Sequence, residues 1–378
     1  MEHSKINKSK PVPEIIALAT DILGNLVNEI SEAQYLPIAG HLTIGWSTEN
    51  EFNASVYSSI QPNDGPEHNI VINYELAVQL YRYAEDFYEF TQEVQLKKDL
   101  QQLPSIFPLQ LIPTSTPKNA CINNMFFGSL TWVLYHELGH AVQEHGIIRK
   151  NNGLSTGVDT HAVHTKELSA QGDTPLSRDQ SIISHITELA ADSEATNIAV
   201  FELLRHASIG TDENPKFDWQ IVLDNCYLLI ASMACTFYRF NRGKMLPAEA
   251  VPSGSHPNAI FRLELVVRQT CKLLKFHAAA SGYKITDRAL LTLVKQAADL
   301  GAMFWYFKHS DQSISINDLV IKGLSERPEF KAYAQEIIPA WEKLLPDILP
   351  IRHFGSDLGI LHFDKEYRQY VFEMQEIN

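Results

Sequence analysis

The residues best suited to chemistry are the two histidines and the glutamate of the motif HELGH, residues 136–140. His136 and His140 are four residues apart, about one helical turn, so both imidazoles project from one helix face and can hold one metal ion. Glu137 lies about 100° around the helix from His136. It is therefore placed to contact a water molecule at the metal rather than the metal itself. The motif predicts one zinc ion per chain, held by the two histidines, with Glu137 as general base.

A helix over residues 125–147 has to present these side chains. Apolar residues recur through this segment at steps of three and four, which is the spacing of a helix with a wide buried face. A chance match to the motif is the alternative interpretation. The apolar residues before the motif, and the small Gly139 and Ala141 that allow close packing, favour a buried, metal-bearing helix instead.

A second predicted helix, residues 179–207, carries the segment ELAAD with Glu188 and Asp192 four residues apart. Carboxylates this close repel each other unless something compensates them. Alanine and leucine flank them, which favours a buried polar site over a solvated face. A catalytic zinc ion needs three protein ligands and one open position. Glu188 is our candidate for the third ligand, and Asp192 our candidate for orienting a zinc histidine through its other ring nitrogen.

The polar connection of residues 149–178 offers an alternative third ligand. Asp159, in TGVDT, would take that place in an aspartate-type zincin. We expect no regular structure in this connection, and one this long is usually functional or disordered. His161 and His164 also lie here. We interpret them as solvated loop histidines, because a mobile loop positions metal ligands poorly.

The amino-terminal part of the chain predicts a small antiparallel sheet. Residues 41–46 and 52–57 are short runs rich in β-branched and aromatic residues, separated by the polar STENE, and they are typical of a hairpin. Residues 68–73, HNIVIN, predict a third strand that leads into a helix.

The remaining chain is mainly helical, so the predicted fold class is α+β. We divide it into an amino-terminal α+β region (1–120), a zinc-binding helical core (121–210) and a helical carboxy-terminal region (211–378), which can also be continuous with the core. Residues 353–372 fit no single element. Helical periodicity predicts further helices at residues 14–32, 74–100, 218–240, 258–280, 287–307, 317–324 and 329–344.

The composition argues against several other functions. The formal net charge is −14 and no cluster of Lys or Arg occurs, which argues against a nucleic-acid partner. The amino terminus lacks the apolar core of a secretory signal. The most apolar stretch, residues 221–237, contains Asp224 and Asn225 and predicts a buried helix rather than a membrane span. The four cysteines form no CxxC pair, so no disulfide framework is expected. We expect a soluble, cytoplasmic protein.

HELGH followed by ELAAD resembles the gluzincin class of zinc metallopeptidases, whose pattern is H-E-x-x-H and then E-x-x-x-D on a second helix. SHPNAIFR (residues 255–262) is similar to a His-Pro segment with a downstream arginine in the HtpX and CAAX-protease relatives of that class, which are embedded in membranes. INYELA (72–77) and WVLYHELGHAVQEH (132–145) resemble the soluble Lit family of phage-exclusion peptidases. These resemblances cover mainly residues 132–199.

The resemblance implies a zincin-like fold and zinc-dependent hydrolysis of peptide bonds in a protein substrate. Glu137 would act as general base on a zinc-activated water, and His256 would stabilise the oxyanion. A strand of the amino-terminal hairpin, or residues 68–73, would offer an edge to which a substrate peptide adds. From a different class, a catalytically silent, metal-stabilised module that binds or senses a partner remains an alternative.

Overall fold

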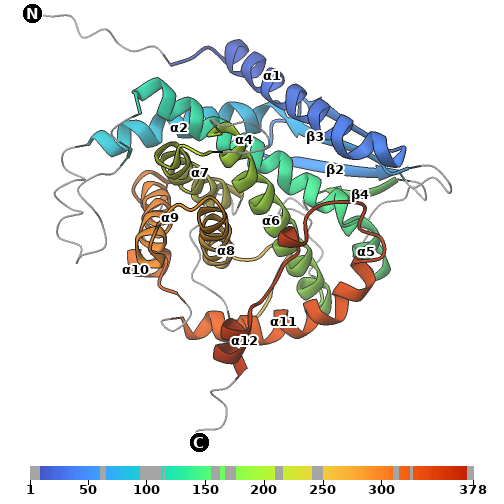
Figure 1. Cartoon of the computed structure of the whole chain (residues 1–378). Coiled ribbons are helices and arrows are strands. Elements are labelled where there is room, and N and C mark those ends of the chain that lie inside the picture. Colours follow the sequence, from blue (N-terminus) through green and yellow to red (C-terminus); the bar gives the residue numbers. More distant parts are fainter. Residues whose placement is uncertain are drawn as a thin grey trace, which may run out of the picture.

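Helices make up most of the chain, and one small sheet lies near its amino terminus (Figure 1). The mainly helical α+β class is therefore confirmed. This computed structural model describes residues 9–59, 65–93, 112–113, 116–154, 162–166, 176–208, 216–240, 250–309, 315–323 and 327–372.

The sheet is mixed, and its strands do not follow chain order. It consists of β1 (His41–Ser47), β2 (Ala54–Ser59), β3 (Glu67–Asn73) and β4 (Ala162–Lys166), in the order β1-β3-β2-β4. β3 pairs parallel with β1 and antiparallel with β2, and β2 pairs antiparallel with β4.

The predicted antiparallel hairpin is wrong, because β3 lies between the two strands that were expected to pair. The physical reason is burial. Ile70 and Ile72 of β3 are fully buried, so the strand gains most apolar contact at the centre of the sheet. A strand paired on both sides cannot accept a substrate peptide, so residues 68–73 are excluded from that role. The edges of the sheet are β1 and β4.

Apart from the helix that carries HELGH, the predicted helices are confirmed to within a few residues, with two exceptions. The predicted helix 74–100 ends early, at Gln92, because Glu93 has an extended backbone, and the predicted helix 317–324 is a single short turn, Ile316–Leu319. Residues 353–372, which the sequence left unassigned, contain the short 3₁₀ turn η4 and the last helix. Residues 94–111, which include the end of the predicted helix 74–100, lie outside the described part of the chain. The elements are α1 (Val12–Ile30), α2 (Tyr74–Gln92), α6 (Arg178–His206), α7 (Trp219–Phe240), α8 (Ala259–Ala280), α9 (Asp287–His309), α10 (Ile316–Leu319), α11 (Pro328–Ile348), η4 (Asp357–Gly359) and α12 (Lys365–Phe372).

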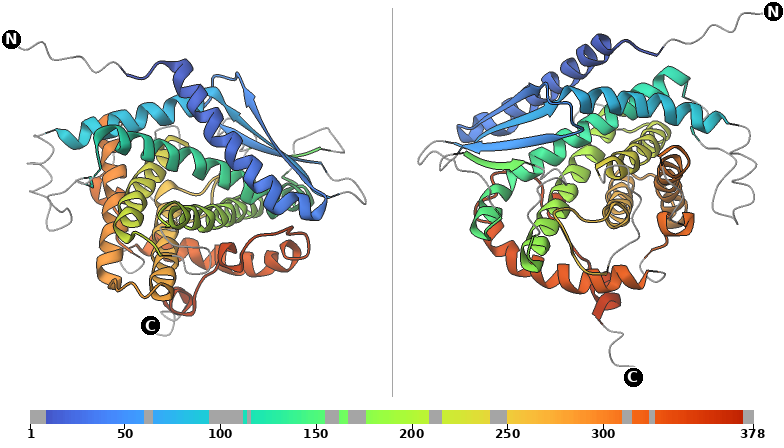
Figure 2. Two further views of the ribbon diagram at one scale, coloured as in Figure 1. Left: turned by 45° about the horizontal axis from the view of Figure 1, so that its top comes forward. Right: turned by 180° about the vertical axis from the view of Figure 1, so that it is seen from behind.

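The helix with the HELGH motif is α4 (Lys118–Val142), and it runs through the centre of the fold. It packs against α2, α6, α7 and strand β2, and all five motif residues are buried. Figure 2 shows the sheet and α1 on one side of it and α11 crossing the opposite end of the molecule. The motif therefore lies in the interior of the protein.

The predicted helix 125–147 ends early, at Val142. Glu144 has backbone angles φ 48° and ψ 43°, in the left-handed region that stops an α-helix. A new helix, α5 (His145–Asn151), begins immediately after it.

The expectation that residues 149–178 lack regular structure is also wrong in part. Arg149 belongs to α5, and β4 within this connection pairs with β2. The strand is stabilised by pairing with a distant segment, which local composition does not reveal. Asp159 and His161 lie outside the described residues, and His164 lies within β4.

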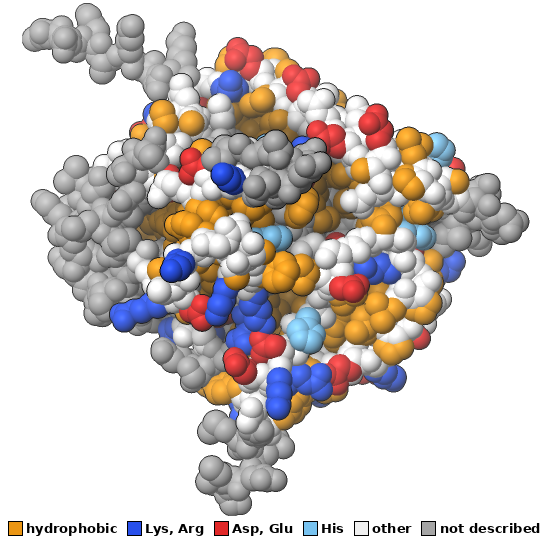
Figure 3. All heavy atoms as spheres, viewed as in Figure 1, with side chains coloured by type: hydrophobic (Ala, Val, Ile, Leu, Met, Phe, Trp, Pro, Cys, Tyr) orange, Lys and Arg blue, Asp and Glu red, His pale blue; other side chains and the backbone are white. Residues whose placement is uncertain are grey.

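Helix α7 is long and apolar enough to cross a membrane, but 83% of its most apolar window is buried inside the fold. That burial is typical of a core helix. On the face shown in Figure 3, basic and acidic side chains are interspersed around the carboxy-terminal elements. In α8, Arg268 and Lys272 both pair with Asp364.

The approach of α4 to α6 depends on a glycine. A Cβ atom added at Gly139 would lie 3.0 Å from the backbone oxygen of Ala191 and 3.2 Å from Cβ of Glu194. These are atoms of the facing helix and not flexible side-chain ends, so a Cβ atom at residue 139 would force the two helices apart by a few tenths of an ångström.

We expect Gly139→Ala to lower the free energy of unfolding by about 1–3 kcal/mol, because the added methyl group overpacks the contact between α4 and α6. Gly24→Ala is the matched control, since a Cβ there meets nothing within 4 Å. It should leave stability unchanged or raise it by up to about 1 kcal/mol. Urea unfolding of both variants measures the difference, and equal stability of the two would contradict the packing argument.

Candidate metal centre and active site

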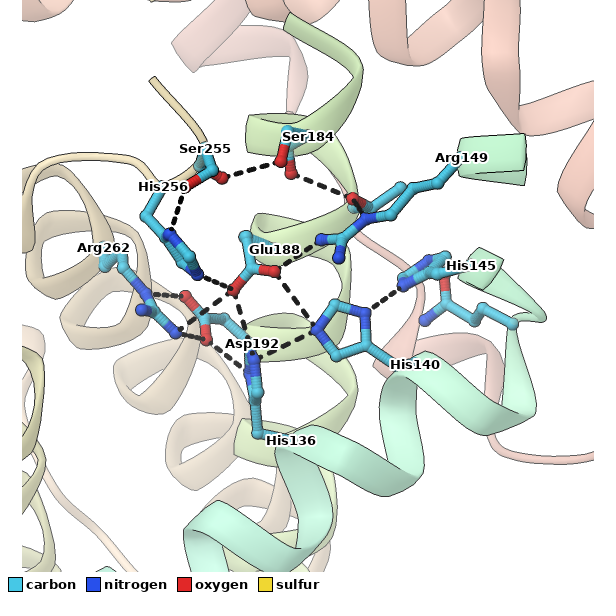
Figure 4. A network of polar contacts seen from close by, with 12 residues as sticks. His136, His140, His145, Arg149, Ser184, Glu188, Asp192, Ser255, His256 and Arg262 are labelled. Atoms are coloured by element: carbon cyan, nitrogen blue, oxygen red, sulfur yellow. Dashed lines mark hydrogen bonds and ion pairs between the residues drawn. The ribbon is translucent and has the colours of Figure 1, made fainter. Parts of the chain in front are cut away.

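Helices α4 and α6 bring His136, His140 and Glu188 together in the interior (Figure 4). One donor atom from each residue lies within 4.8 Å of the others, and all three side chains are buried. The two histidine Nε2 atoms are 3.2 Å apart. The Glu188 carboxylate lies 3.3 Å from each of them, through Oε2 to His136 and Oε1 to His140.

These spacings fit a zinc ion. Zinc–nitrogen bonds of about 2.0–2.1 Å in a tetrahedral site place neighbouring ligand atoms about 3.3–3.4 Å apart. In addition, the buried Oε2 of Glu188 accepts no well-formed hydrogen bond from the described residues. Such an oxygen is costly to bury unless a positive charge lies beside it, and either the protonated ring of His136, 3.3 Å away, or a metal ion in place of that proton supplies the charge. The donor set of two imidazoles and one carboxylate is one that zinc accepts.

His136 is oriented from behind by a carboxylate that an arginine holds in place. Its Nδ1 lies 2.9 Å from Oδ1 of Asp192. Arg262 of α8 donates two hydrogen bonds to Asp192, from Nε at 2.8 Å and from Nη2 at 2.7 Å. Burial lowers the pKa of His136, but contacts with Asp192 and Glu188 outweigh it and raise the pKa to about 10. A metal ion therefore has to displace a proton here.

His140 has a different partner, which the sequence analysis missed. Its Nδ1 lies 2.8 Å from Nδ1 of His145, and His145 Nε2 lies 3.3 Å from Oε1 of Gln143. Burial lowers the pKa of His140 to about 3 and holds that of His145 well below its usual value, so both rings are neutral. With neutral rings, His140 donates from Nδ1 and leaves Nε2 free for a metal. His145 is five residues after His140, so in a continuous helix it would not share a face with His140. The left-handed turn at Glu144 brings its ring back to His140.

Glu188 is held by a second arginine that the sequence analysis also missed. Arg149 Nη2 donates to Glu188 Oε1 at 2.5 Å, and its Nε donates to Thr187 at 2.9 Å. The arginine is buried. No sequence pattern predicts this role, because Arg149 stands at the start of a polar stretch. Arg149 and Arg262 together compensate the charges of Glu188 and Asp192. They therefore offset the repulsion expected from two carboxylates four residues apart on one helix.

His256 reaches the same centre from the loop before α8. Its Nε2 lies 3.9 Å from Oε2 of Glu188, and its Nδ1 lies 2.8 Å from the hydroxyl of Ser255. Helix α6 holds this loop, because the Ser184 hydroxyl donates to the Ser255 carbonyl at 2.7 Å. Burial lowers the pKa of His256 to about 4, so the ring is neutral. If Ser255 donates to Nδ1, the proton of the ring is on Nε2, directed toward the centre.

Glu137 follows His136 on α4 and is buried. It is not one of the three residues whose donor atoms converge, and its place beside a metal stays a prediction. Asp159, the alternative third ligand, lies outside the described residues.

A buried His-His-Glu group on two packed helices, with a glutamate directly after the first histidine, is the type of site that zinc peptidases have. The family model described as Peptidase U49 matches residues 54–273, which is more than half of the chain. The chain belongs to the peptidase U49 family, the family of the Lit peptidase, and is a peptide-bond hydrolase. The predicted resemblance to the Lit family is confirmed. No curated protein and no solved structure matches the chain.

The identity of the third ligand can be tested by zinc titration. Glu188→Ala should abolish tight zinc binding at the His136, His140 and Glu188 centre, because it removes a ligand. Asp192→Ala should weaken it by about 10–100-fold, because His136 loses its orienting partner. Asp159→Ala is the control and should bind zinc as the parent does. Loss of zinc in Asp159→Ala, together with full retention in Glu188→Ala, would overturn this assignment in favour of an aspartate-type site.

Proposed function

We propose that this protein is a zinc-dependent metallopeptidase of the gluzincin type, in which His136, His140 and Glu188 hold the zinc ion. The observation that carries the proposal is the spacing of their donor atoms, 3.2–3.3 Å apart in a buried site of a chain that belongs to a peptidase family. A protein substrate follows from the family, and we propose the cytoplasm as its place of action.

A bound zinc ion would lower the pKa of a water molecule and polarise the carbonyl group of the substrate. Glu137 would accept the proton of that water and then deliver it to the leaving amine. Its burial supports this role, because a carboxylate shielded from bulk water keeps the proton it has taken. His256 would donate a hydrogen bond from Nε2 to the oxygen that becomes negative as the carbonyl is attacked.

The surrounding residues hold this machinery in position. Arg262 fixes Asp192, which orients His136, and His145 orients His140. Arg149 occupies one oxygen of Glu188, which leaves the other directed toward His136. Ligands locked in this way are already in the geometry that the metal needs, so binding costs little reorganisation.

Of the two edge strands, β4 is a better candidate than β1 for binding the substrate peptide. It packs beside α5, the helix that carries Arg149, whereas the other edge strand, β1, packs against α1. A peptide that adds to β4 would therefore pass close to the metal centre.

Replacing the proposed base separates catalysis from metal binding. Glu137→Gln should keep the fold and its zinc, because the ligands are intact, and should lose peptide hydrolysis by several orders of magnitude. The measurement is cleavage of a mixed peptide library, with zinc content determined on the same samples. The exposed Glu49→Gln is the control and should cleave at the parent rate. Equal cleavage by Glu137→Gln would exclude this mechanism, and absence of cleavage by the parent protein would favour a silent binding module.

Replacing the proposed oxyanion donor should affect the rate rather than the metal. His256→Ala should lower kcat by about 10²–10³-fold, as loss of one such donor does, while zinc content and KM change little. Steady-state kinetics on a peptide identified from the library measure both constants. A rise in KM with kcat unchanged would instead make His256 a residue that binds the substrate in its ground state.

A further inference from the structure

A second group of side chains whose types could hold a metal ion meets at the turn between α4 and α5. It consists of His68 from β3, Glu144 from the turn and His353 from the segment after α11. Their donor atoms all lie within 4.8 Å of one another. His68 Nε2 is 3.2 Å, and His353 Nε2 is 2.6 Å, from the same oxygen, Oε1 of Glu144. Three segments far apart in the chain thus direct two imidazoles and one carboxylate at one point.

Glu144 is held in a conformation that favours this arrangement. Its left-handed backbone is unusual for a residue with a side chain and costs about 1 kcal/mol, so the surrounding structure has to maintain it. The residue is only 4% exposed. Its second oxygen, Oε2, is buried and has no hydrogen-bond partner among the described residues. A buried carboxylate oxygen left without a hydrogen bond is costly unless a cation lies beside it.

Both histidines are anchored by contacts that leave their Nε2 atoms directed at Glu144. The hydroxyl of Tyr35 lies 2.7 Å from Nδ1 of the buried His68, and a partner on the far nitrogen is typical of a metal-binding histidine. The backbone N–H of His353 donates to the carbonyl of Val142 at 3.1 Å. The side chain of His353 is 26% exposed, which gives the cluster an opening to solvent.

We propose that His68, Glu144 and His353 form a second metal site, which binds a divalent transition-metal ion such as zinc. Two imidazoles and a carboxylate suit zinc in particular, and three protein ligands leave one position for water. The distance from His68 to Glu144 already matches the edge of a tetrahedral site. The distance from His353 has to open by about 0.7 Å, and the partly exposed His353 is the member best placed to move.

This site is distinct from the first, yet the chain joins them directly. His145, which contacts His140 of the first site, is the residue after Glu144. A metal at the second site would fix the turn between α4 and α5 and so steady His145. The same metal would also connect the segment that contains His353 to the sheet and to the turn. This segment lies beyond the residues matched by the family model.

The competing interpretation is a triad without metal, in which both histidines donate their Nε2 protons to Glu144. The two interpretations differ in the number of zinc ions that the full-length chain binds. We expect the metal-stripped protein to take up two equivalents of zinc in a calorimetric titration, with elemental analysis after dialysis as a second readout. Glu188→Ala should retain the equivalent at the second site, and His353→Ala should retain the one at the first.

The controls separate a lost ligand from a damaged fold. His362→Ala removes an exposed histidine from the same carboxy-terminal segment and should still bind two equivalents. His353→Gln keeps a hydrogen-bond donor for Glu144, and it should bind one equivalent with a circular dichroism spectrum like that of the parent.

The outcomes also distinguish this proposal from the proposed function. If the parent protein binds one equivalent of zinc and Glu188→Ala binds none, the second site is overturned and the first is left intact. Retention of two equivalents in both His353 variants would overturn it as well. One equivalent that survives Glu188→Ala and is lost in both His353 variants would support the second site and contradict zinc binding at the first.

Discussion

The close contact between α4 and α6 at Gly139 is the constraint on which the rest of the structure depends. It sets the distance between the helix that supplies two imidazoles and the helix that supplies the carboxylates. A shift of even 1 Å between them would move Glu188 out of the range of a shared metal, because zinc tolerates only a few tenths of an ångström in its bond lengths. The apolar core around α4 keeps this contact rigid, since close-packed interiors resist small displacements.

Burying so many ionisable groups has a cost that the structure offsets with paired charges. Asp192 and Glu188 would be strongly destabilising if each were alone in the interior. Arg262 and Arg149 compensate them, and each arginine comes from a helix other than α4 and α6. Removing either arginine therefore leaves a buried carboxylate unpaired, so these residues contribute to folding and to the geometry of the centre together. Stability and function are coupled at this place.

The carboxy-terminal segment after α11 belongs to the same network. Arg352 pairs with the buried Glu194 of α6, which also accepts a hydrogen bond from Gln143. His353 contacts Glu144, in the turn between α4 and α5. These contacts connect a part of the chain beyond the family match to the residues that orient His140. The segment after α11 therefore supports the residues of the proposed metal centre.

The sequence by itself determined what depends on local spacing. Two histidines or two carboxylates four residues apart share a helix face in any fold. The shared faces of HELGH and ELAAD, and nearly all of the helices, could therefore be predicted. Only the tertiary structure decided the contacts between distant segments. The central place of β3 depends on which strand buries most apolar surface, and the roles of His145 and Arg149 depend on a left-handed turn at Glu144. No pattern in neighbouring residues encodes such contacts, because packing of the whole chain selects them.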